Sequence, residues 1–79
     1  MRKLKLIWDF HGPDANNIAQ HHEKHLKDYI IIEKLDITIT GVETLSDMHT
    51  IAFLVLNEDQ MKPIRDVLKP HRGQIYMNE

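Results

Sequence analysis

The sequence predicts a single α+β domain that spans residues 1–79, with its elements in the order strand, helix, strand, strand, helix, strand. Three observations predict this fold. A length of 79 residues leaves room for one domain only. Hydrophobic residues make up 42% of the chain and charged residues 28%, which is the balance of a globular protein. Finally, the spacing of the apolar residues changes along the chain between a period of two and a helical period.

The first strand is predicted over Leu4–Phe10, because its largest apolar side chains fall on alternate positions. Gly12 and Pro13 break the strand, and Pro13 suits the first position of a helix. Asp14 would add negative charge at the positive end of that helix. The helix is expected to run from Asp14 to about Lys34, since its apolar residues recur at helical spacing.

Two further strands follow. The second is predicted over Asp36–Val42, where Gly41 marks either a bulge or the strand end. Ser46 and Asp47 indicate a turn. The third strand, Met48–Leu56, is apolar on both faces.

The second helix is expected to begin after Asn57, with Gln60 as its capping-box partner, and to continue to about Lys69. Pro63 lies deep enough to predict a kink or a late helix start. His71 and Arg72 would either bind an anion or cap the end of this helix, and capping is the favoured role. A last strand is predicted over Gln74–Met77. This element order is that of the ferredoxin-like fold, with both helices on one face of an antiparallel sheet.

Size matching predicts the pairing of the two central strands. If His11 lies opposite His49, large residues meet small ones on one face, which suits a packed core. The other predicted pairs are Asp9 with Ile51, Ile7 with Phe53, Lys5 with Val55, Phe10 with Thr50, Trp8 with Ala52 and Leu6 with Leu54.

The two faces of this sheet have different expected roles. The face with Leu4, Leu6, Trp8 and Phe10 is assigned to the helices, and the opposite face carries Ile7, Ile51, Phe53 and Val55. We expect no element of the chain to cover that second face, and an open apolar surface is usually a partner surface. The sequence therefore predicts a homodimer in which two sheets pack face to face around a cavity, with an exposed sheet on a monomer as the alternative.

Four segments together resemble one known superfamily. They are the aromatic Trp8–Phe10, the break at Gly12–Pro13, the histidine-rich His21–Leu26 and the closing Lys69–Gly73. With the doubly apolar third strand, they are similar to the dimeric α+β barrel superfamily, which includes small antibiotic-biosynthesis monooxygenases, muconolactone isomerases and many bacterial proteins. The resemblance covers nearly the whole chain and implies a ferredoxin-like homodimer. It implies no particular chemistry, because one fold hosts many functions.

Six histidines are the unusual chemical feature of the chain. His21 and His25 are four residues apart and could reach one metal ion from the same helix face, although a polar helix flank is the favoured interpretation. His22 falls in the middle of the apolar stripe and should point at the sheet. It is interpreted first as a core histidine bonded to a strand carbonyl or to Tyr29, and second as a ligand-binding pocket residue.

The best candidate site combines Asp9, His11 and His49, which the predicted pairing brings to one end of the uncovered face. A carboxylate beside two imidazoles could hold a divalent metal through His11 and His49, or it could tune a general base. Ordinary surface histidines at a strand end remain an equal alternative. Ile7, Ile51 and Phe53 would line the adjoining ligand cavity.

Three functions fit these features. The first is a ligand-binding or enzymatic barrel in which His or Asp transfers a proton to or from a small organic molecule. The second is a divalent-metal module that uses imidazoles, and the third is a structural interaction domain. A net charge of −2 argues against a general nucleic-acid binder, and the absence of cysteine excludes disulfides and thiolate chemistry. With no apolar stretch long enough for a membrane span and no signal peptide expected, the predicted location is the cytoplasm.

Overall fold

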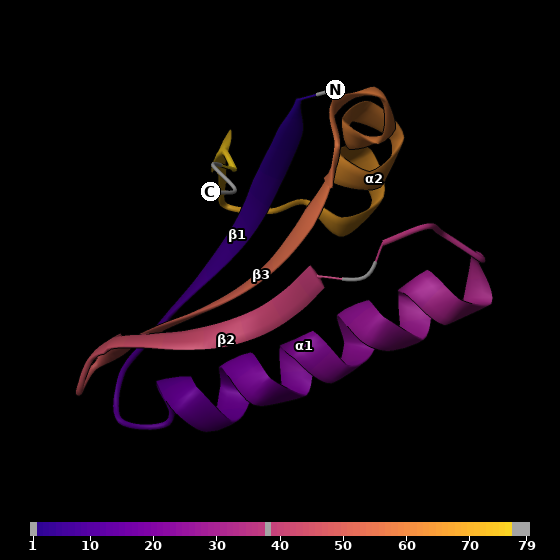
Figure 1. Ribbon diagram of the computed structural model, residues 1–79. Helices are drawn as coiled ribbons and strands as arrows, with labels where there is room; N and C mark the ends of the chain where they lie inside the picture. The colour runs from indigo at the N-terminus through magenta and orange to yellow at the C-terminus, as the bar shows by residue number, and fades with distance from the viewer. Residues whose placement is uncertain (1, 38, 77–79) are drawn as a thin grey trace.

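The computed structural model describes residues 2–37 and 39–76. The elements occur in the predicted order, and the second helix is preceded by one 3₁₀ turn, η1 (Figure 1). Their bounds are β1 Lys3–His11, α1 Ala15–Ile32, β2 Ile39–Ser46, β3 His49–Asn57, η1 Glu58–Gln60, α2 Met61–Leu68 and β4 Arg72–Ile75. Within the described ranges, no helix combines the length and the apolar character that crossing a bilayer requires.

The four strands form one antiparallel sheet in the order β2-β3-β1-β4. The predicted pairing of the two central strands is confirmed at every position, from Lys5 opposite Val55 to His11 opposite His49. Size matching found this register because a shift of one residue would have exchanged the two faces of a strand, and only one face can enter the core.

The core lies between the sheet and the two helices. Leu6 and Trp8 of β1 pack with Leu26 of α1 and Ile64 of α2 in one cluster of buried side chains. Because both helices contribute to this cluster, they cover the same face of the sheet, as Figure 1 also shows. The assignment of the Leu4, Leu6, Trp8 and Phe10 face to the helices is therefore confirmed.

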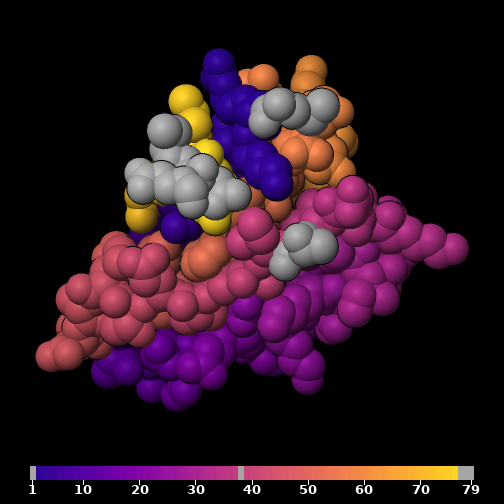
Figure 2. Space-filling model, viewed as in Figure 1, coloured from indigo at the N-terminus to yellow at the C-terminus, as the bar shows by residue number. Residues whose placement is uncertain are grey.

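Helix α1 packs against β3 and β2, and Figure 2 shows the surface of β2 beside that of α1. Two side-chain hydrogen bonds join the elements: Asn16 Nδ2 donates to Thr44 Oγ1 at 3.0 Å, and Thr40 Oγ1 donates to Glu23 Oε2 at 3.1 Å. These contacts fix the long helix against the edge strand.

The predicted bounds of the second strand are wrong at both ends. β2 begins at Ile39 and continues to Ser46, so the turn lies at Asp47 and Met48. The bulge lies between Thr44 and Ser46 rather than at Gly41. Gly41 has a different role, because a Cβ atom there would lie 2.6 Å from Cζ of Phe53. The glycine leaves room for the Phe53 ring to lie across the neighbouring strand.

The helix ends also differ from prediction in detail. α1 begins at Ala15, so Pro13 precedes the helix instead of opening it. The capping box of Asn57 and Gln60 is confirmed, but it caps η1, and α2 starts only at Met61, which is the late start that Pro63 indicated.

The last strand lies earlier than predicted. β4 is Arg72–Ile75 rather than Gln74–Met77, and Met77 lies outside the described residues. Helix α2 closes at Lys69, a non-glycine residue with φ of +51°, and the chain then turns directly into β4.

The sheet face away from the helices is not the open apolar surface that the sequence predicts. Ile7 is 1% exposed, Ile51 3% and Val55 4%, and only Phe53 is partly exposed. Long polar side chains of the same face lean over the apolar ones: the Lys5 ammonium lies 4.3 Å from the centre of the Phe53 ring. The expectation of an uncovered apolar face is therefore wrong, and the argument for a dimer that rested on it is lost.

Candidate acid–base site on the open sheet face

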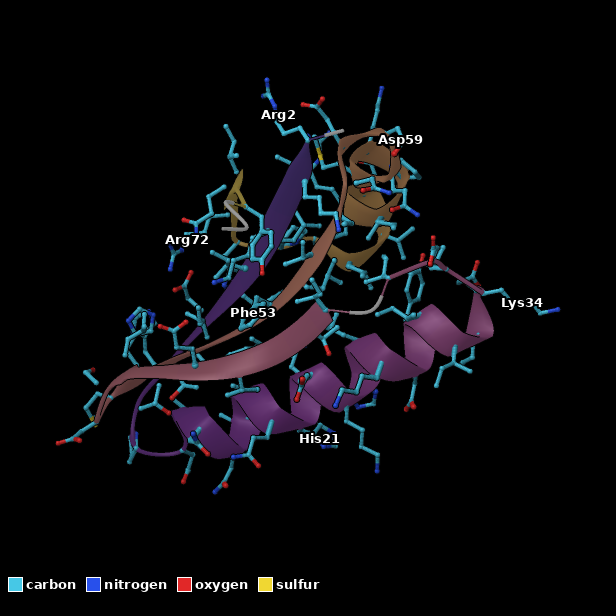
Figure 3. The ribbon with its side chains drawn as sticks, viewed as in Figure 1. Arg2, His21, Lys34, Phe53, Asp59 and Arg72 are labelled. Carbon is cyan, nitrogen blue, oxygen red and sulfur yellow. The ribbon has the colours of Figure 1, made fainter. Side chains whose placement is uncertain are left out.

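Three strands place one polar cluster on the sheet face that no helix covers. Asp9 comes from β1, His49 from β3 and Arg72 from β4. Asp9 is opposite Ile51 and therefore diagonal to His49, while Arg72 is opposite Ile7 and diagonal to Asp9. Diagonal neighbours on one face are within reach of long side chains, so all three groups meet at the Asp9 carboxylate. Figure 3 labels Arg72 at one edge of this face.

The Asp9 carboxylate accepts hydrogen bonds from both neighbours. Nε2 of His49 lies 2.8 Å from Oδ1. The Arg72 guanidinium donates from Nε to Oδ2 at 3.0 Å and from Nη2 to Oδ1 at 3.1 Å. This two-point ion pair fixes the plane of the carboxylate as well as its position.

Electrostatics keep Asp9 ionised. The hydrogen bond from Arg72 lowers the pKa of Asp9 to about 2, helped by the hydrogen bond from His49 and opposed by burial. The Asp9 side chain is 17% exposed, His49 26% and Arg72 48%. The cluster is thus anchored in the sheet on its carboxylate side and open to solvent on its histidine and arginine side.

This arrangement sets the tautomer of His49. An ionised carboxylate can only accept hydrogen bonds, so the proton of a neutral His49 must be on Nε2. Nδ1 of His49 is then the unprotonated nitrogen, which can act as a base. The His11 ring stacks on His49, with ring centres 4.3 Å apart and an angle of 22° between the planes. The predicted association of Asp9, His11 and His49 is present in the structure.

The sequence reasoning missed the part that Arg72 and His71 play in this cluster. Both were expected to cap the second helix, yet Arg72 pairs with Asp9, and the Asp9 backbone N–H donates to Nδ1 of His71 at 2.8 Å. The feature that would have revealed the role of Arg72 is its pairing opposite Ile7, which places it on the same sheet face as Asp9. It could not be found because the last strand was predicted to start two residues too late.

His22 lies on the opposite side of the sheet from this cluster. Its ring packs against Trp8 at 4.9 Å and Phe10 at 5.4 Å between centres, which confirms that it points at the sheet. Its Nε2 atom is buried and, among the described residues, has no hydrogen-bond partner, so the expected bond from this nitrogen to a strand carbonyl or to Tyr29 is absent. His22 therefore belongs to the helix-side core and cannot share a ligand with Asp9.

Acidification is expected to destabilise the fold through His22. Burial lowers the pKa of this imidazole, and the nearby His25 and His71 lower it further. As pH falls below about 6.5, the unfolded chain takes up this proton before the folded chain does, so the free energy of unfolding decreases. Urea unfolding at neutral and mildly acidic pH should show a smaller decrease in His22→Leu than in the wild type. His21→Gln, which changes an exposed histidine on the same helix, should retain the full decrease, and equal decreases in all three proteins would contradict the assignment.

His21 and His25 form a pair on the exposed side of α1, with their Nε2 atoms 3.0 Å apart. No group of three or more His, Asp or Glu side chains is arranged to hold a metal ion within residues 2–37 and 39–76. At the other predicted site the Arg72 guanidinium already occupies the Asp9 carboxylate, where a divalent cation would otherwise bind. Metal binding by His11 and His49, or by His21 and His25, stays a prediction without further support.

The predicted cavity lining needs correction. Ile7 and Ile51 are packed within the sheet face and present almost no surface to a ligand. Phe53 is the exception, since its ring is partly exposed beneath the Lys5 ammonium. The two hollows that the structure describes involve neither Ile7, Ile51, Phe53 nor His22.

Comparisons with protein-family models, with curated proteins and with solved structures found no match.

Proposed function

We propose that the chain is a small acid–base protein that transfers a proton to or from a small organic molecule at the open sheet face. The observation that carries this proposal is the 2.8 Å hydrogen bond between Asp9 and His49, with Asp9 itself held by Arg72. A carboxylate that fixes a histidine tautomer, beside a nitrogen free to accept a proton, is the usual arrangement of a general base.

Each residue has a distinct part in this reaction. Nδ1 of His49 takes the proton from a carbon next to a carbonyl group, and the electron pair of the broken C–H bond moves to the carbonyl oxygen. The ionised Asp9 stabilises the imidazolium that forms. Arg72 uses two donor nitrogens on Asp9, and its remaining N–H groups could stabilise the enolate oxygen. Return of a proton to the same carbon completes an exchange of its hydrogen. Where a double bond is conjugated with the enolate, return to the γ-carbon of the dienolate completes an isomerisation.

The charge of the site favours an anionic substrate. Arg72 is about half exposed, and Lys5 lies on the same face above Phe53. A small carboxylate with an adjacent carbonyl group would bind these cations through its carboxylate and place the hydrogen-bearing carbon next to that carbonyl near His49. The Phe53 ring offers a modest apolar surface for the rest of the molecule.

We also propose a more specific fold and an assembly state for the chain. We infer that the sheet and its two helices form the ferredoxin-like arrangement. Association of two chains through the sheet faces that carry no helix, as in a dimeric α+β barrel, stays part of this proposal, although it no longer rests on an exposed apolar surface. Such a dimer would place two Asp9–His49 pairs in one enclosed space, where exclusion of water would strengthen the electrostatic effects. A monomeric mass by light scattering at micromolar concentration would refute the dimer and leave the single-chain site intact.

The proposed function is tested with a panel of small 2-keto carboxylates, starting with pyruvate and 2-oxobutyrate. In D2O the protein should accelerate exchange of the hydrogens next to the carbonyl group, followed by ¹H NMR. His49→Gln should lower the protein-dependent exchange by about a hundredfold or more, because general-base catalysis typically contributes that much.

One control and one further variant accompany this experiment. The control, His21→Gln, removes an exposed histidine of α1 and should retain full exchange. Arg72→Gln removes a proposed substrate-binding group and should raise the substrate concentration needed for half-maximal exchange. The proposal is contradicted if His49→Gln and the wild type accelerate exchange equally, or if the whole panel exchanges at the rate seen without protein.

A further inference from the structure

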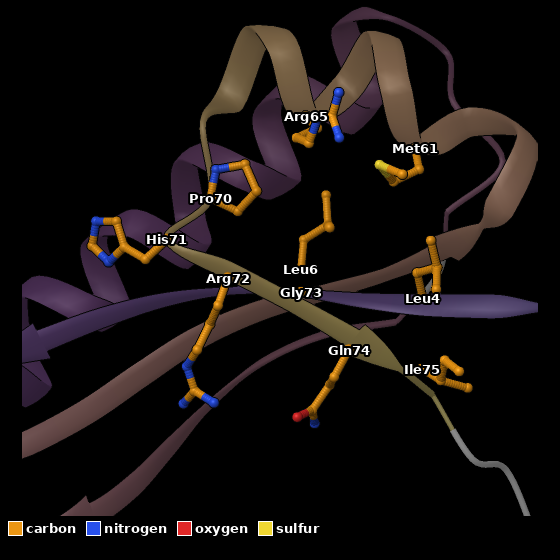
Figure 4. Close-up of a pocket in the computed structure, with 10 residues that line it drawn as sticks. All are labelled: Leu4, Leu6, Met61, Arg65, Pro70, His71, Arg72, Gly73, Gln74 and Ile75. Atoms are coloured by element: carbon orange, nitrogen blue, oxygen red, sulfur yellow. The ribbon is translucent and has the colours of Figure 1, made fainter.

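A second region with binding character lies on the helix side of the sheet, away from Asp9 and His49. A hollow of about 470 Å³ opens between α2 and β4, with β1 as its floor (Figure 4). Its lining residues are Leu4, Leu6, Met61, Arg65, Pro70, His71, Arg72, Gly73, Gln74 and Ile75. A volume of this size falls within the range of small-molecule sites.

The hollow exists because β4 is short and carries a glycine at its centre. Gly73 lies opposite Leu6, and a Cβ atom at position 73 would be 3.4 Å from the Leu6 Cδ2 atom. Any side chain at this position would point towards the helices and fill the space between the strand and α2. The missing side chain leaves Leu6 as an apolar floor below Arg65 and Met61, as Figure 4 shows.

The lining is mostly apolar, with the Arg65 guanidinium at its rim. Leu4, Leu6 and Met61 provide hydrocarbon and thioether surface, and no carboxylate is among the lining residues that the structure describes. Figure 4 shows Arg72 and Gln74 extending away from the hollow, on the other side of β4. Arg65 extends from α2 above Leu6 and is the charged group at the rim.

Arg65 has a guanidinium that is available to a ligand. Its nearest ionic partner is the adjacent Asp66, with Nη2 and Oδ1 3.6 Å apart, and the two side chains are 49% and 59% exposed. An exposed contact of this length contributes little to stability, so a ligand anion could replace it at small cost.

We propose that this hollow binds a medium-chain aliphatic carboxylate, with the hydrocarbon chain over Leu6 and Met61 and the carboxylate on Arg65. At about 30 Å³ for each water-sized group, the space holds roughly fifteen such groups. Decanoate has this size and charge. His71 and Arg72 belong both to this lining and to the acid–base cluster, but the Arg72 side chain extends away from the hollow (Figure 4), and the proposal does not depend on the function proposed for that cluster.

The experiment is a titration of the ¹⁵N-labelled chain with monomeric decanoate, followed by amide chemical shifts and calorimetry. Saturable one-to-one binding should move the amide signals of Leu6, Met61 and Gly73. Decanol, which lacks the charge, should bind roughly three to five times more weakly, because a half-exposed ion pair contributes up to about that factor.

Two variants locate the ligand, and a third is their control. Arg65→Met should weaken decanoate binding by the same factor and remove the difference between decanoate and decanol. Gly73→Val suits a strand and adds three carbon groups directly beside Leu6, where the hydrocarbon chain is proposed to lie. It should weaken binding while the circular dichroism spectrum and Tm stay native. Lys62→Met removes a positive charge from α2 outside the hollow and should change nothing.

Several results would overturn the proposal. Equal affinities for decanoate and decanol, or unchanged binding in Arg65→Met, would remove the anion-binding role of Arg65. Full binding in a folded Gly73→Val variant would place the ligand elsewhere, and the absence of saturable binding would exclude the site.

Discussion

Replacing Trp8 with alanine is expected to lower the free energy of unfolding by about 3 to 5 kcal/mol, as for other buried aromatic residues. Trp8 is 3% exposed and lies in the middle of the core cluster between sheet and helices. Its indole Nε1 donates to the carbonyl oxygen of Leu68 at 3.1 Å, which ties the end of α2 to β1. A domain of this length has a total stability of only about 4 to 12 kcal/mol. Urea unfolding should therefore show a transition midpoint at a much lower urea concentration than in the wild type.

The conservative variant Trp8→Phe separates the two contributions of this residue. It retains most of the buried ring and loses the hydrogen bond to Leu68, so it should cost about 1 to 3 kcal/mol, the penalty of an unpaired buried carbonyl. If alanine and phenylalanine at position 8 cost the same, the packing of the indole against Leu26 and His22 would not contribute as the structure indicates.

The variant Asp9→Asn is expected to lower stability at neutral pH by about 1 to 2 kcal/mol. The side chain keeps its shape but loses the charge that Arg72 and His49 bind. Since Asp9 has a pKa of about 2 in the folded chain and 3.8 as its ordinary value, the shift corresponds to about 2 kcal/mol before solvent screening of the half-exposed Arg72 reduces it.

The lowered pKa of Asp9 also determines how the stability difference between the wild type and Asp9→Asn depends on pH. A lowered pKa in the folded state stabilises the protein above the ordinary pKa, and the stabilisation is lost as pH falls from about 4 to 2, because the unfolded chain is protonated first. The wild type and Asp9→Asn should therefore converge in stability near pH 2, measured by urea unfolding across that range. Asp47→Asn, at an exposed residue of the turn between β2 and β3, should show neither effect. A constant gap between wild type and Asp9→Asn at all pH values would contradict the ion pair.

The sequence allowed the central strand pair to be predicted residue by residue. The alternation of large and small side chains in Leu4–Phe10 and Met48–Leu56 has one good alignment, and the structure has that alignment. Once His11 is opposite His49, the meeting of Asp9 with His49 follows from the geometry of a strand pair. The half of the site that lies on β1 and β3 was thus accessible to pattern reasoning.

The remaining half depends on features that local pattern does not specify. β4 has only four residues, and all of them are exposed, so its start and register are not marked by buried apolar positions. Without that register Arg72 could not be placed beside Asp9. The burial of Ile7 was missed for a related reason, because apolar residues indicate which side chains seek burial but not that Lys5 and Arg72 would extend across the same face.

The end of the second helix is determined by the backbone conformation of one residue, Lys69. The sequence predicts that this helix continues to about Lys69, and in the structure Lys69 itself ends it by adopting the left-handed conformation that glycine normally provides. The Lys69 amide still donates to the carbonyl oxygen of Arg65, so the backbone bond compensates in part for the strained angle. This tight turn lets β4 begin at Arg72 and brings the guanidinium to the site.

The protonation state of neutral His49 tests the central claim most directly. Long-range ¹H–¹⁵N correlation spectra of the wild type, recorded at a pH where His49 is neutral, should show the proton on Nε2 and an unprotonated Nδ1. In Asp9→Asn this preference should weaken towards the mixture of tautomers of an imidazole without a fixed partner. A proton on Nδ1 in the wild type, or the same tautomer mixture with and without the Asp9 carboxylate, would contradict the account of Asp9 and His49 as an acid–base pair.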